Sequence, residues 1–183
     1  MADRKDFEAA ALPHLDAVYR AAYALCGNHA QAEDLAQATF LRAWKRFDSY
    51  RPGTNCRAWL LRILRNRWID MLRHRGVTGP MAPLPEDLAA EEAGPVETSW
   101  SNAEDVLENF SDEQVIAALR ELPDDQRLAL FLLDVEGLTQ EEAADVLDVA
   151  VGTVKSRTSR ARRALHERLF GRARDLGWVE RKP

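Results

Sequence analysis

Apolar residues recur with a helical period along most of the chain, and residues 138–165 carry the most informative pattern. Thr139, followed three positions later by Glu142, has the spacing of a capping box at the start of a helix. We therefore predict a short helix, a tight turn at residues 148–150, and a longer helix from about Gly152. One face of the longer helix is formed by Val154, Thr158, Ala161 and Leu165.

The rest of the longer helix is basic and hydroxylated. It carries Lys155, Ser156, Arg157, Ser159, Arg160, Arg162 and Arg163. Two helices joined by a tight turn, the second with one apolar and one basic face, are typical of a helix-turn-helix whose second helix enters a DNA major groove. The pattern alone also allows a helical hairpin with a solvated basic face.

Two helices are predicted in residues 4–47. The first spans Arg4–Cys26; Pro13 should kink or split it, and Gly27 should end it. Asn28 and Gln31 then resemble a capping pair. The second helix has an apolar stripe of Ala32, Leu35, Ala36, Thr39, Phe40, Ala43, Trp44 and Phe47.

Another face of the second helix combines Asp34, Gln37 and Leu41. We expect Leu41 to be exposed. A leucine among polar groups can mark a partner surface, although single exposed leucines are common and need no function.

A loop of turn-forming residues at 47–56 precedes a third helix, predicted over 57–74. Its core face should hold Leu60, Leu61, Leu64, Trp68, Met71 and Leu72. Its opposite face carries Arg62, Arg65, Asn66, Ile69, Asp70 and Arg73. Arginine suits phosphate and asparagine suits a base edge, while the neighbouring Tyr50 and Trp59 are the ingredients for stacking unpaired bases. The alternative is that Trp59 and Trp68 both lie in the core and that the arginines are simply solvated.

In the last third of the chain, Ser111 and Gln114 predict a capped helix through Glu121. After a break at residues 122–123, Asp124 and Asp125 fall in the first turn of another helix, where they favour its dipole. We expect Gly137 to end that helix. Its core face should hold Leu128, Phe131, Leu132 and Val135.

Charge divides this chain of 183 residues. Its formal net charge of −5 argues against a protein that coats nucleic acid without specificity. Residues 57–75 and 155–174 are basic, whereas residues 77–119 contain no lysine or arginine. Glycine and proline breaks in residues 76–110 predict a flexible acidic linker. The predicted fold is all-α, with two small helical domains.

Several other classes of function find little support. Cys26 and Cys56 lack metal-site spacing and suggest reduced thiols in a cytosolic protein. His29 and Glu33 lack a third ligand, and no catalytic arrangement stands out, so we expect no enzyme, metal or cofactor. Apolar runs are too short to span a membrane, and the N-terminus lacks the apolar segment of a signal peptide. We expect a cytoplasmic protein.

Three blocks in order resemble the bacterial extracytoplasmic-function sigma factors, minimal members of the sigma-70 family. Residues 32–44 (AEDLAQATFLRAW) resemble region 2.2, the family's main clamp-binding helix, and residues 47–75 resemble regions 2.3 and 2.4. The chain from Leu122 resembles region 4, ending in VGTVKSR. The resemblance implies a region 2 domain at 1–75, the linker at 76–110, a region 4 domain at 111–175 with the helix-turn-helix at 138–165, and a tail at 176–183.

The resemblance also implies roles for residues at matching positions. Those expected to meet the polymerase clamp are Asp34, Gln37 and Leu41. Those expected around the −10 strand are Tyr50, Asn55, Trp59, Arg62, Arg65 and Asn66, with residues 51–56 resembling the pocket for a flipped base. Those expected at −35 base edges are Lys155, Ser156, Ser159 and Arg160, with Thr153, Arg157 and Arg162 nearer phosphate.

The chain departs from the family pattern at four positions. Ala38 stands where an acid is usual, and Asp148 stands where a turn glycine is usual. Ala143 and Ala150 replace the commoner isoleucine and proline.

The implied function is transcription initiation with core RNA polymerase as partner, promoter DNA as target and an anti-sigma factor as regulator. The alternative is an autonomous helix-turn-helix repressor or activator with an N-terminal effector domain. A ligand-sensing domain would not need the Arg62 and Asn66 face.

We predict that limited proteolysis cuts the chain first between Gly76 and Phe110, because a flexible linker is more accessible than packed helices. Mass spectrometry of the fragments would locate the cuts. Resistance of this segment while either domain is digested would contradict the prediction.

Overall fold

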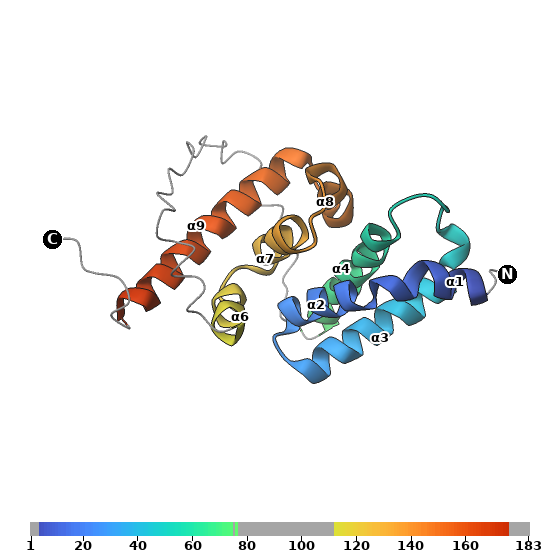
Figure 1. Cartoon of the computed structure of the whole chain (residues 1–183), viewed down its shortest axis with the longest axis horizontal. Helices are drawn as coiled ribbons and strands as arrows, with labels where there is room; N and C mark the ends of the chain where they lie inside the picture. The colour runs from blue at the N-terminus through green and yellow to red at the C-terminus, as the bar shows by residue number, and fades with distance from the viewer. Residues whose placement is uncertain (1–3, 75, 77–111, 176–183) are drawn as a thin grey trace.

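The structure is a computed structural model that describes residues 4–74, 76 and 112–175. In these ranges the chain forms helices and no strand, which confirms the all-α prediction (Figure 1). The α-helices are α1 (Arg4–Ala11), α2 (Leu15–Cys26), α3 (His29–Lys45), α4 (Cys56–His74), α6 (Asp112–Arg120), α7 (Asp124–Leu130), α8 (Gln140–Leu147) and α9 (Val151–Asp175). Ser111, residues 77–110 and the tail at 176–183 lie outside the described ranges.

The predicted helix boundaries near the N-terminus are confirmed. Pro13 lies in a 3-10 turn, Leu12–His14, that separates α1 from α2. Gly27 ends α2 in the left-handed region with φ 61°, which glycine adopts without steric cost. The Asn28 side chain then accepts a hydrogen bond of 3.1 Å from the backbone nitrogen of Gln31 and caps α3.

Helices α2, α3 and α4 pack around the apolar faces that the sequence predicts. Leu60, Leu61, Leu64 and Trp68 of α4 are buried, while Met71 and Leu72 are half-buried at its end. On α3 the expected stripe is buried through Ala43 except for the half-buried Phe40. Trp44 is exposed at the edge, where its ring meets that of Phe7 with 5.2 Å between centroids. The burial of Leu60, Leu61 and Leu64 stabilises this half by removing apolar surface from water.

The helix-turn-helix is confirmed in detail. Thr139 accepts from the backbone nitrogen of Glu142 at 3.1 Å, and Glu142 accepts from that of Thr139 at 2.9 Å, which completes the capping box. Asp148 occupies the left-handed region with φ 53°, where the family's usual glycine would be less strained. Helix α9 begins at Val151, one residue earlier than expected. On its inner face Val154, Thr158 and Ala161 are buried, while Leu165 is half-buried.

The prediction that Val135 lies in the core is wrong. Residues Phe131–Val135 form a π-helical turn, in which the backbone nitrogen of Glu136 donates to the carbonyl of Phe131 at 3.0 Å. This wider turn shifts the helical register by one residue, so the 3.6-residue period no longer places side chains correctly. Val135 is consequently 54% exposed, and the carboxylate-bearing Glu136 is only 3% exposed.

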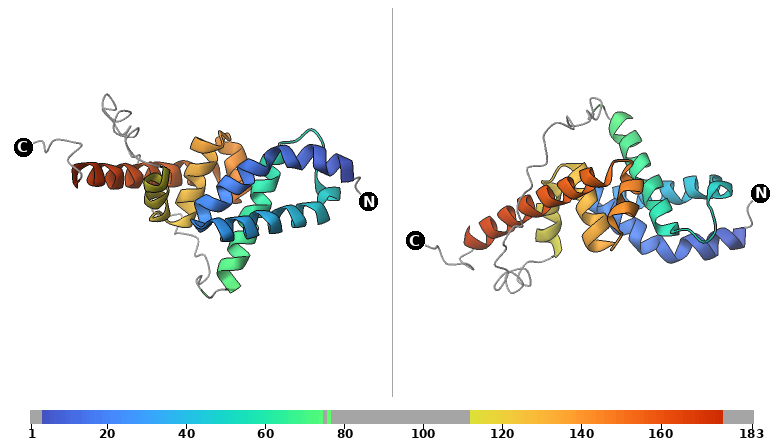
Figure 2. Two further views of the ribbon diagram at one scale, coloured as in Figure 1. Left: turned by 60° about the horizontal axis from the view of Figure 1, so that its bottom comes forward. Right: turned by 90° about the horizontal axis from the view of Figure 1, so that it is seen from above.

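The two halves of the chain pack against each other, which the sequence did not predict. Helix α2 contacts α7, and α4 contacts α8, as the views in Figure 2 agree. One continuous apolar cluster includes Leu25 and Leu64 from the first half and Leu132 and Leu147 from the second. The helices of both halves therefore share buried surface.

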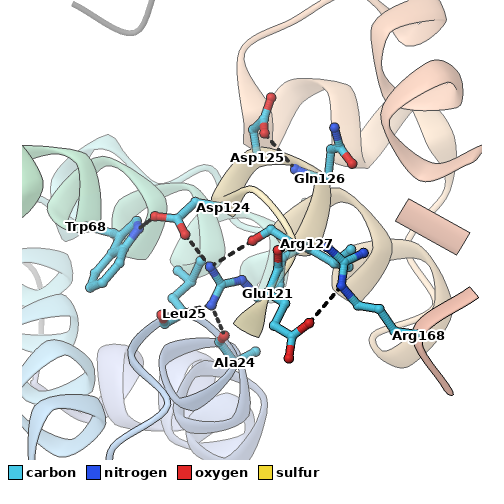
Figure 3. Close-up of polar contacts among 10 residues, drawn as sticks. Ala24, Leu25, Trp68, Glu121, Asp124, Asp125, Gln126, Arg127 and Arg168 are labelled. Carbon is cyan, nitrogen blue, oxygen red and sulfur yellow. Dashed lines mark hydrogen bonds and ion pairs between the residues drawn. The ribbon is translucent and has the colours of Figure 1, made fainter. Parts of the chain in front are cut away.

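Arg127 of α7 joins the halves through a buried set of hydrogen bonds (Figure 3). Its side chain is 7% exposed, and its Nη1 donates to the carbonyls of Ala24 at 3.1 Å and Leu25 at 3.3 Å. Its Nη2 donates to the carbonyl of Leu122 at 3.3 Å and also to the Asp124 carboxylate. Because Ala24 and Leu25 lie in the last turn of α2, the guanidinium satisfies carbonyls that have no partner within that helix and faces the negative end of its dipole.

Further polar contacts also join the halves. Trp68 Nε1 of α4 donates to Asp124 Oδ2 at 2.9 Å (Figure 3). The buried carboxylate of Glu136 meets Arg20 Nη2 at 2.9 Å and Arg57 Nη1 at 3.6 Å, both from the first half. Since an unpaired buried carboxylate is costly, these arginines make the position of Glu136 dependent on the packed arrangement.

We predict that Arg127→Met lowers the free energy of unfolding by about 2–4 kcal/mol, because it leaves two α2 carbonyls and the Asp124 carboxylate without their shared donor. Urea denaturation followed by circular dichroism would measure the loss. Arg163→Met, which removes the same charge from an exposed position of α9, is the matched control and should change stability little. Equal effects of the two substitutions would contradict the structural role of Arg127.

Candidate nucleic-acid interface

The loop before α4 is held in shape by local contacts. Asn55 Oδ1 accepts from the backbone nitrogen of Ala58 at 3.1 Å, and the Tyr50 hydroxyl donates to the Thr54 carbonyl at 2.9 Å. The rings of Tyr50 and Trp59 lie 5.2 Å apart between centroids, and that of Phe47 stacks on Tyr50 at 5.5 Å. Tyr50 and Trp59 are half-buried rather than exposed, so their rings support the loop as well as lining the surface.

The outer face of α4 carries the basic and amide groups that the sequence predicts. Arg62 and Asn66 are exposed, whereas Arg65 is half-buried and donates from Nη1 to Asn66 Oδ1 at 3.0 Å. Desolvation lowers the pKa of Arg65, but a guanidinium stays charged at neutral pH. This face therefore presents cations and an amide on a rigid helix.

A cleft of about 470 Å³ extends along this face. Its lining is formed by Arg42, Arg65, Asn66, Ile69, Asp70, Arg73 and Asp148. Arg42 comes from α3 and Asp148 from the turn of the helix-turn-helix, and sequence analysis assigned neither to this site. Their part in it depends on packing between helices, for which a local pattern has no signal.

On the outer side of α9, Lys155 and Arg160 are exposed, and Thr153, Ser156 and Ser159 are half-buried. These residues share a solvent-facing side of the second helix of the helix-turn-helix, which is the position that reads base edges in such motifs. The structure thus brings five of the seven predicted −35 residues to one accessible face.

The other two predicted −35 residues are held by acids of their own half. The Arg157 side chain is only 12% exposed, and its Nε lies 3.1 Å from Asp125 Oδ2. Arg162 makes a two-pronged contact with Asp134, with Nη2 to Oδ1 at 2.6 Å and Nε to Oδ2 at 3.0 Å. This bidentate geometry and the charge of Asp134 raise the pKa of Arg162.

The helix-turn-helix also touches the face of α4. Asn55 Nδ2 donates to Glu142 Oε1 at 2.6 Å, and Arg62 Nη2 lies 3.9 Å from Asp148 Oδ1. Glu142 thereby completes its capping box and binds the other half at the same time. The hydrogen bond from Asn55 and then that from the Thr139 backbone lower the pKa of Glu142.

The candidate polymerase-binding face lies on α3. Asp34, Gln37 and Leu41 are all exposed, and Leu41 is 57% exposed as expected. These residues are three, four and seven positions apart, which places them on one side of the helix. They form a small apolar spot within a polar surface.

Other side chains that could carry chemistry, such as His29 and the cysteines, are part of the packed structure. The Tyr19 hydroxyl is 2.7 Å from His29 Nδ1, and the Tyr23 ring stacks on His29 at 4.4 Å. Within residues 4–74, 76 and 112–175 no three side chains gather that could hold a metal ion, and both Cys26 and Cys56 are buried thiols. None of the helices in these ranges is both long and apolar enough to cross a membrane.

Comparison with known protein families gives two matches, in order along the chain. The Sigma-70 region 2 family matches residues 11–78, and the Sigma-70, region 4 family matches residues 112–165. The first covers α2, α3 and α4, and the second covers α6 through most of α9.

Individual relatives agree with these two family matches. The ECF RNA polymerase sigma factor SigE of Mycolicibacterium smegmatis is 42% identical over 85% of this chain and 58% of its own length. The ECF RNA polymerase sigma factor EcfG of Rhodopseudomonas palustris is 39% identical over 88% of this chain and 82% of its own. Among solved structures, the sigma factor RpoE of Bartonella quintana in complex with the anti-sigma factor NepR has a TM-score of 0.69 and 31% identity, covering 90% of this chain and 97% of that chain.

We predict that the stabilisation contributed by Glu142 disappears in acid. A carboxylate whose pKa is lowered by folding stabilises the protein above its unfolded pKa, and this contribution is lost as the pH falls through the folded value. Urea denaturation at several pH values should show wild type more stable than Glu142→Gln near neutrality and a difference that vanishes below the ordinary glutamate range. Glu141→Gln, from the same first turn of α8, is the control. A difference that does not change with pH would contradict this role.

Proposed function

The chain belongs to the extracytoplasmic-function sigma factors of the sigma-70 family, and we propose that it directs promoter-specific transcription initiation as a subunit of RNA polymerase. One observation carries this proposal. The two family matches, in order, coincide with the two surfaces built from basic and amide side chains, on α4 and on α9. The chain itself supplies recognition and positioning, and the catalytic chemistry of transcription belongs to core polymerase.

The region 4 helix-turn-helix recognises the −35 element in this proposal. Lys155 and Arg160 project from the outer face of α9, with the hydroxyls of Ser156 and Ser159 beside them. Arginine reads guanine edges in the major groove through a two-pronged hydrogen bond, whereas lysine binds as a point charge. The DNA phosphates are bound by Thr153, Arg157 and Arg162. The two arginines bind them after they separate from Asp125 and Asp134.

The face of α4 recognises the −10 element in this proposal. Arg62 and Arg65 bind the strand backbone, and Asn66 and Asn55 offer amide groups to base edges. Tyr50 and Trp59 form the aromatic floor of the loop at residues 51–56, where an unstacked base could pack. A preformed loop is favourable because less conformational entropy is lost on binding.

The exposed Asp34, Gln37 and Leu41 face of α3 binds the polymerase clamp in this proposal. Leu41 supplies the apolar contact and its polar neighbours orient it, as at the centre of many interfaces. The usual acid of the family is replaced by the half-buried Ala38, which removes one potential ionic contact.

Regulation by an anti-sigma factor is part of the proposal. It is supported by the likeness to a sigma factor solved in complex with one. Such a protein would compete for the same exposed surfaces, and the cytoplasm, where polymerase works, is the compartment we propose. No feature of the described structure favours an autonomous repressor, because a separate effector domain would not carry the region 2 match.

Run-off transcription tests the proposal directly. Purified chain is added to core polymerase on a promoter library, and transcripts are sequenced. We expect start sites that depend on the added chain and share −35 and −10 elements. Transcription identical to that of core polymerase alone would refute the proposal.

We predict that Arg160→Ala and Asn66→Ala impair different steps. Loss of Arg160 should weaken closed-complex binding and relax −35 preference, since a bidentate base contact contributes about 1–3 kcal/mol of discrimination. Loss of Asn66 should reduce strand opening more than initial binding. Permanganate footprinting beside binding assays separates the steps, with Arg4→Ala, at an exposed position of α1 outside both surfaces, as a control. Identical defects in both steps for both variants would contradict this division.

A further inference from the structure

The two asparagines that we assign to base edges on α4 each have their amide oxygen engaged. The side chain of Asn66 is exposed, and its Oδ1 accepts a hydrogen bond of 3.0 Å from Arg65 Nη1. Asn55 precedes the first residue of α4, and its Oδ1 accepts from the backbone nitrogen of Ala58 at 3.1 Å. The oxygen of each amide thus faces a donor that belongs to α4 itself.

The chemistry of these donors determines which amide atom they contact. A guanidinium carries hydrogen-bond donors and no acceptor, so Arg65 pairs with the oxygen of Asn66 and not with its nitrogen. The backbone nitrogen of Ala58 is likewise a donor, and Asn55 makes the side-chain contact of a helix N-cap. A flip of either amide would place two donors against each other. The oxygen of both side chains is therefore fixed toward α4, and the NH2 group is turned away from these donors.

The nitrogen of each amide is the group that remains for a ligand. Asn55 Nδ2 donates to Glu142 Oε1 at 2.6 Å, so this nitrogen is directed away from the backbone that the oxygen caps. Among the residues that the structure describes, no acceptor is hydrogen-bonded to Asn66 Nδ2. Because Arg65 and Asn66 are neighbours on one helix, their contact does not depend on the position of any other element.

An amide held in this way distinguishes bases by their exocyclic groups. An asparagine that is free to turn recognises adenine with two hydrogen bonds, one accepted from N6 and one donated to N7. Asn66 is not free to make the first of these bonds, because its oxygen faces Arg65. Thymine O4 and guanine O6 are acceptors and suit the NH2 group, whereas adenine N6 and cytosine N4 are donors and would oppose it.

On the basis of the proposed function, we propose that Arg65 is a positioning residue that sets base preference in the −10 element by orienting the amide of Asn66. The oriented NH2 group selects a keto base, guanine or thymine, over an amino base, adenine or cytosine. The N-cap contact gives Asn55 the same preference. The two asparagines are separated by about 16 Å of helical rise, so they read different nucleotides. The other N–H groups of Arg65 stay available to the strand backbone.

A promoter library randomised through the −10 element tests the proposal with assembled holoenzyme. A transcribed barcode identifies each −10 sequence, and the preference at each position is the ratio of transcripts from keto and amino bases. The position read by Asn66 is the one at which Asn66→Ala removes the preference. We expect wild type to favour keto bases there by about five-fold or more, as for other directional contacts to a base edge. The absence of such a position, or a wild-type preference for amino bases there, would overturn the proposal.

Substitutions of two arginines on this face separate orientation from charge. Arg65→Met removes the donor that holds Asn66, so the amide can turn and accept from adenine N6. We expect the keto preference at that position to fall to about two-fold or less. Arg62→Met removes the same charge one turn earlier on the face and should lower transcription from all library members alike, as for a phosphate contact. Equal loss of preference in the two variants would show a general charge effect and overturn the orienting role.

Conservative variants change the donors and acceptors without changing the shape of the site. Lysine also carries donors only, so Arg65→Lys should retain the keto preference. Asn66→Asp replaces the NH2 group with an acceptor and should reverse the preference toward cytosine and adenine, whose exocyclic amino groups donate. Asn55→Asp keeps an N-cap residue and should cause the same reversal at a second position. A keto preference that persists in Asn66→Asp would contradict selection by the NH2 group.

Nuclear magnetic resonance of the free protein tests the orientation without polymerase. The side-chain NH2 resonances of Asn66 are assigned by their loss in Asn66→Asp. We expect Arg65→Met to shift these resonances and Arg62→Met to shift them much less, since Arg65 is the arginine that contacts the amide. Unchanged resonances in Arg65→Met would overturn the orienting role alone. Failure of wild-type holoenzyme to initiate would refute the proposed function, and the resonances would still decide whether Arg65 orients Asn66.

Discussion

The arrangement of the two halves depends on a buried cation that caps a helix of the other half. Arg127 reaches from α7 to the last turn of α2, where the carbonyls of Ala24 and Leu25 accept from its guanidinium. Desolvation lowers the pKa of Arg127, which expresses the cost of burying its charge. The α2 carbonyls offset part of that cost, so removal of α7 from α2 would leave the end of α2 without its donor and the guanidinium with only Leu122 and Asp124.

Contacts between the halves differ in burial along the interface. Around α2 and α7 two charged side chains, Arg127 and Glu136, are nearly inaccessible to solvent. Along α4 and α8 an apolar seam is flanked by contacts at exposed side chains, Asn55 with Glu142 and Arg62 with Asp148. Buried contacts resist salt and water, whereas exposed ones exchange readily. The face of α4 that we assign to the −10 strand thus lies beside the part of the interface that a charged competitor can reach.

Local signals in the sequence were sufficient for the helices and for the helix-turn-helix. Pro13, Gly27, Asn28 and the Thr139 capping box act within a few residues of themselves, so their effects could be predicted. The π-helical turn could not be predicted, because its extra residue does not change the spacing of apolar residues in the sequence. The prediction that Val135 is buried was wrong for that reason.

The candidate site shows the same limit. Lys155 and Arg160 lie on the predicted outer face of α9, since helical spacing alone fixes that face. Arg157 falls on the predicted basic side of the same helix, yet it is nearly buried beside Asp125, which is 32 positions earlier in the chain. Its partner, like those of Arg62 and Asn55, is determined by packing between helices. A single sequence contains the residues of such pairs without indicating which of them meet.

These pairs bear on how a chain with a net charge of −5 would use the two DNA-binding faces that we propose. Four residues assigned to promoter contacts, Asn55, Arg62, Arg157 and Arg162, each meet an acid of this chain. Nonspecific DNA binding gains most of its free energy from counterions released when cations neutralise phosphates. A cation already neutralised by a carboxylate releases fewer counterions and must first lose that partner. We therefore expect isolated duplex to bind the free protein weakly. A promoter held open by polymerase would present many phosphates and unpaired bases at once, and we expect their combined interaction to exceed that of the internal acids.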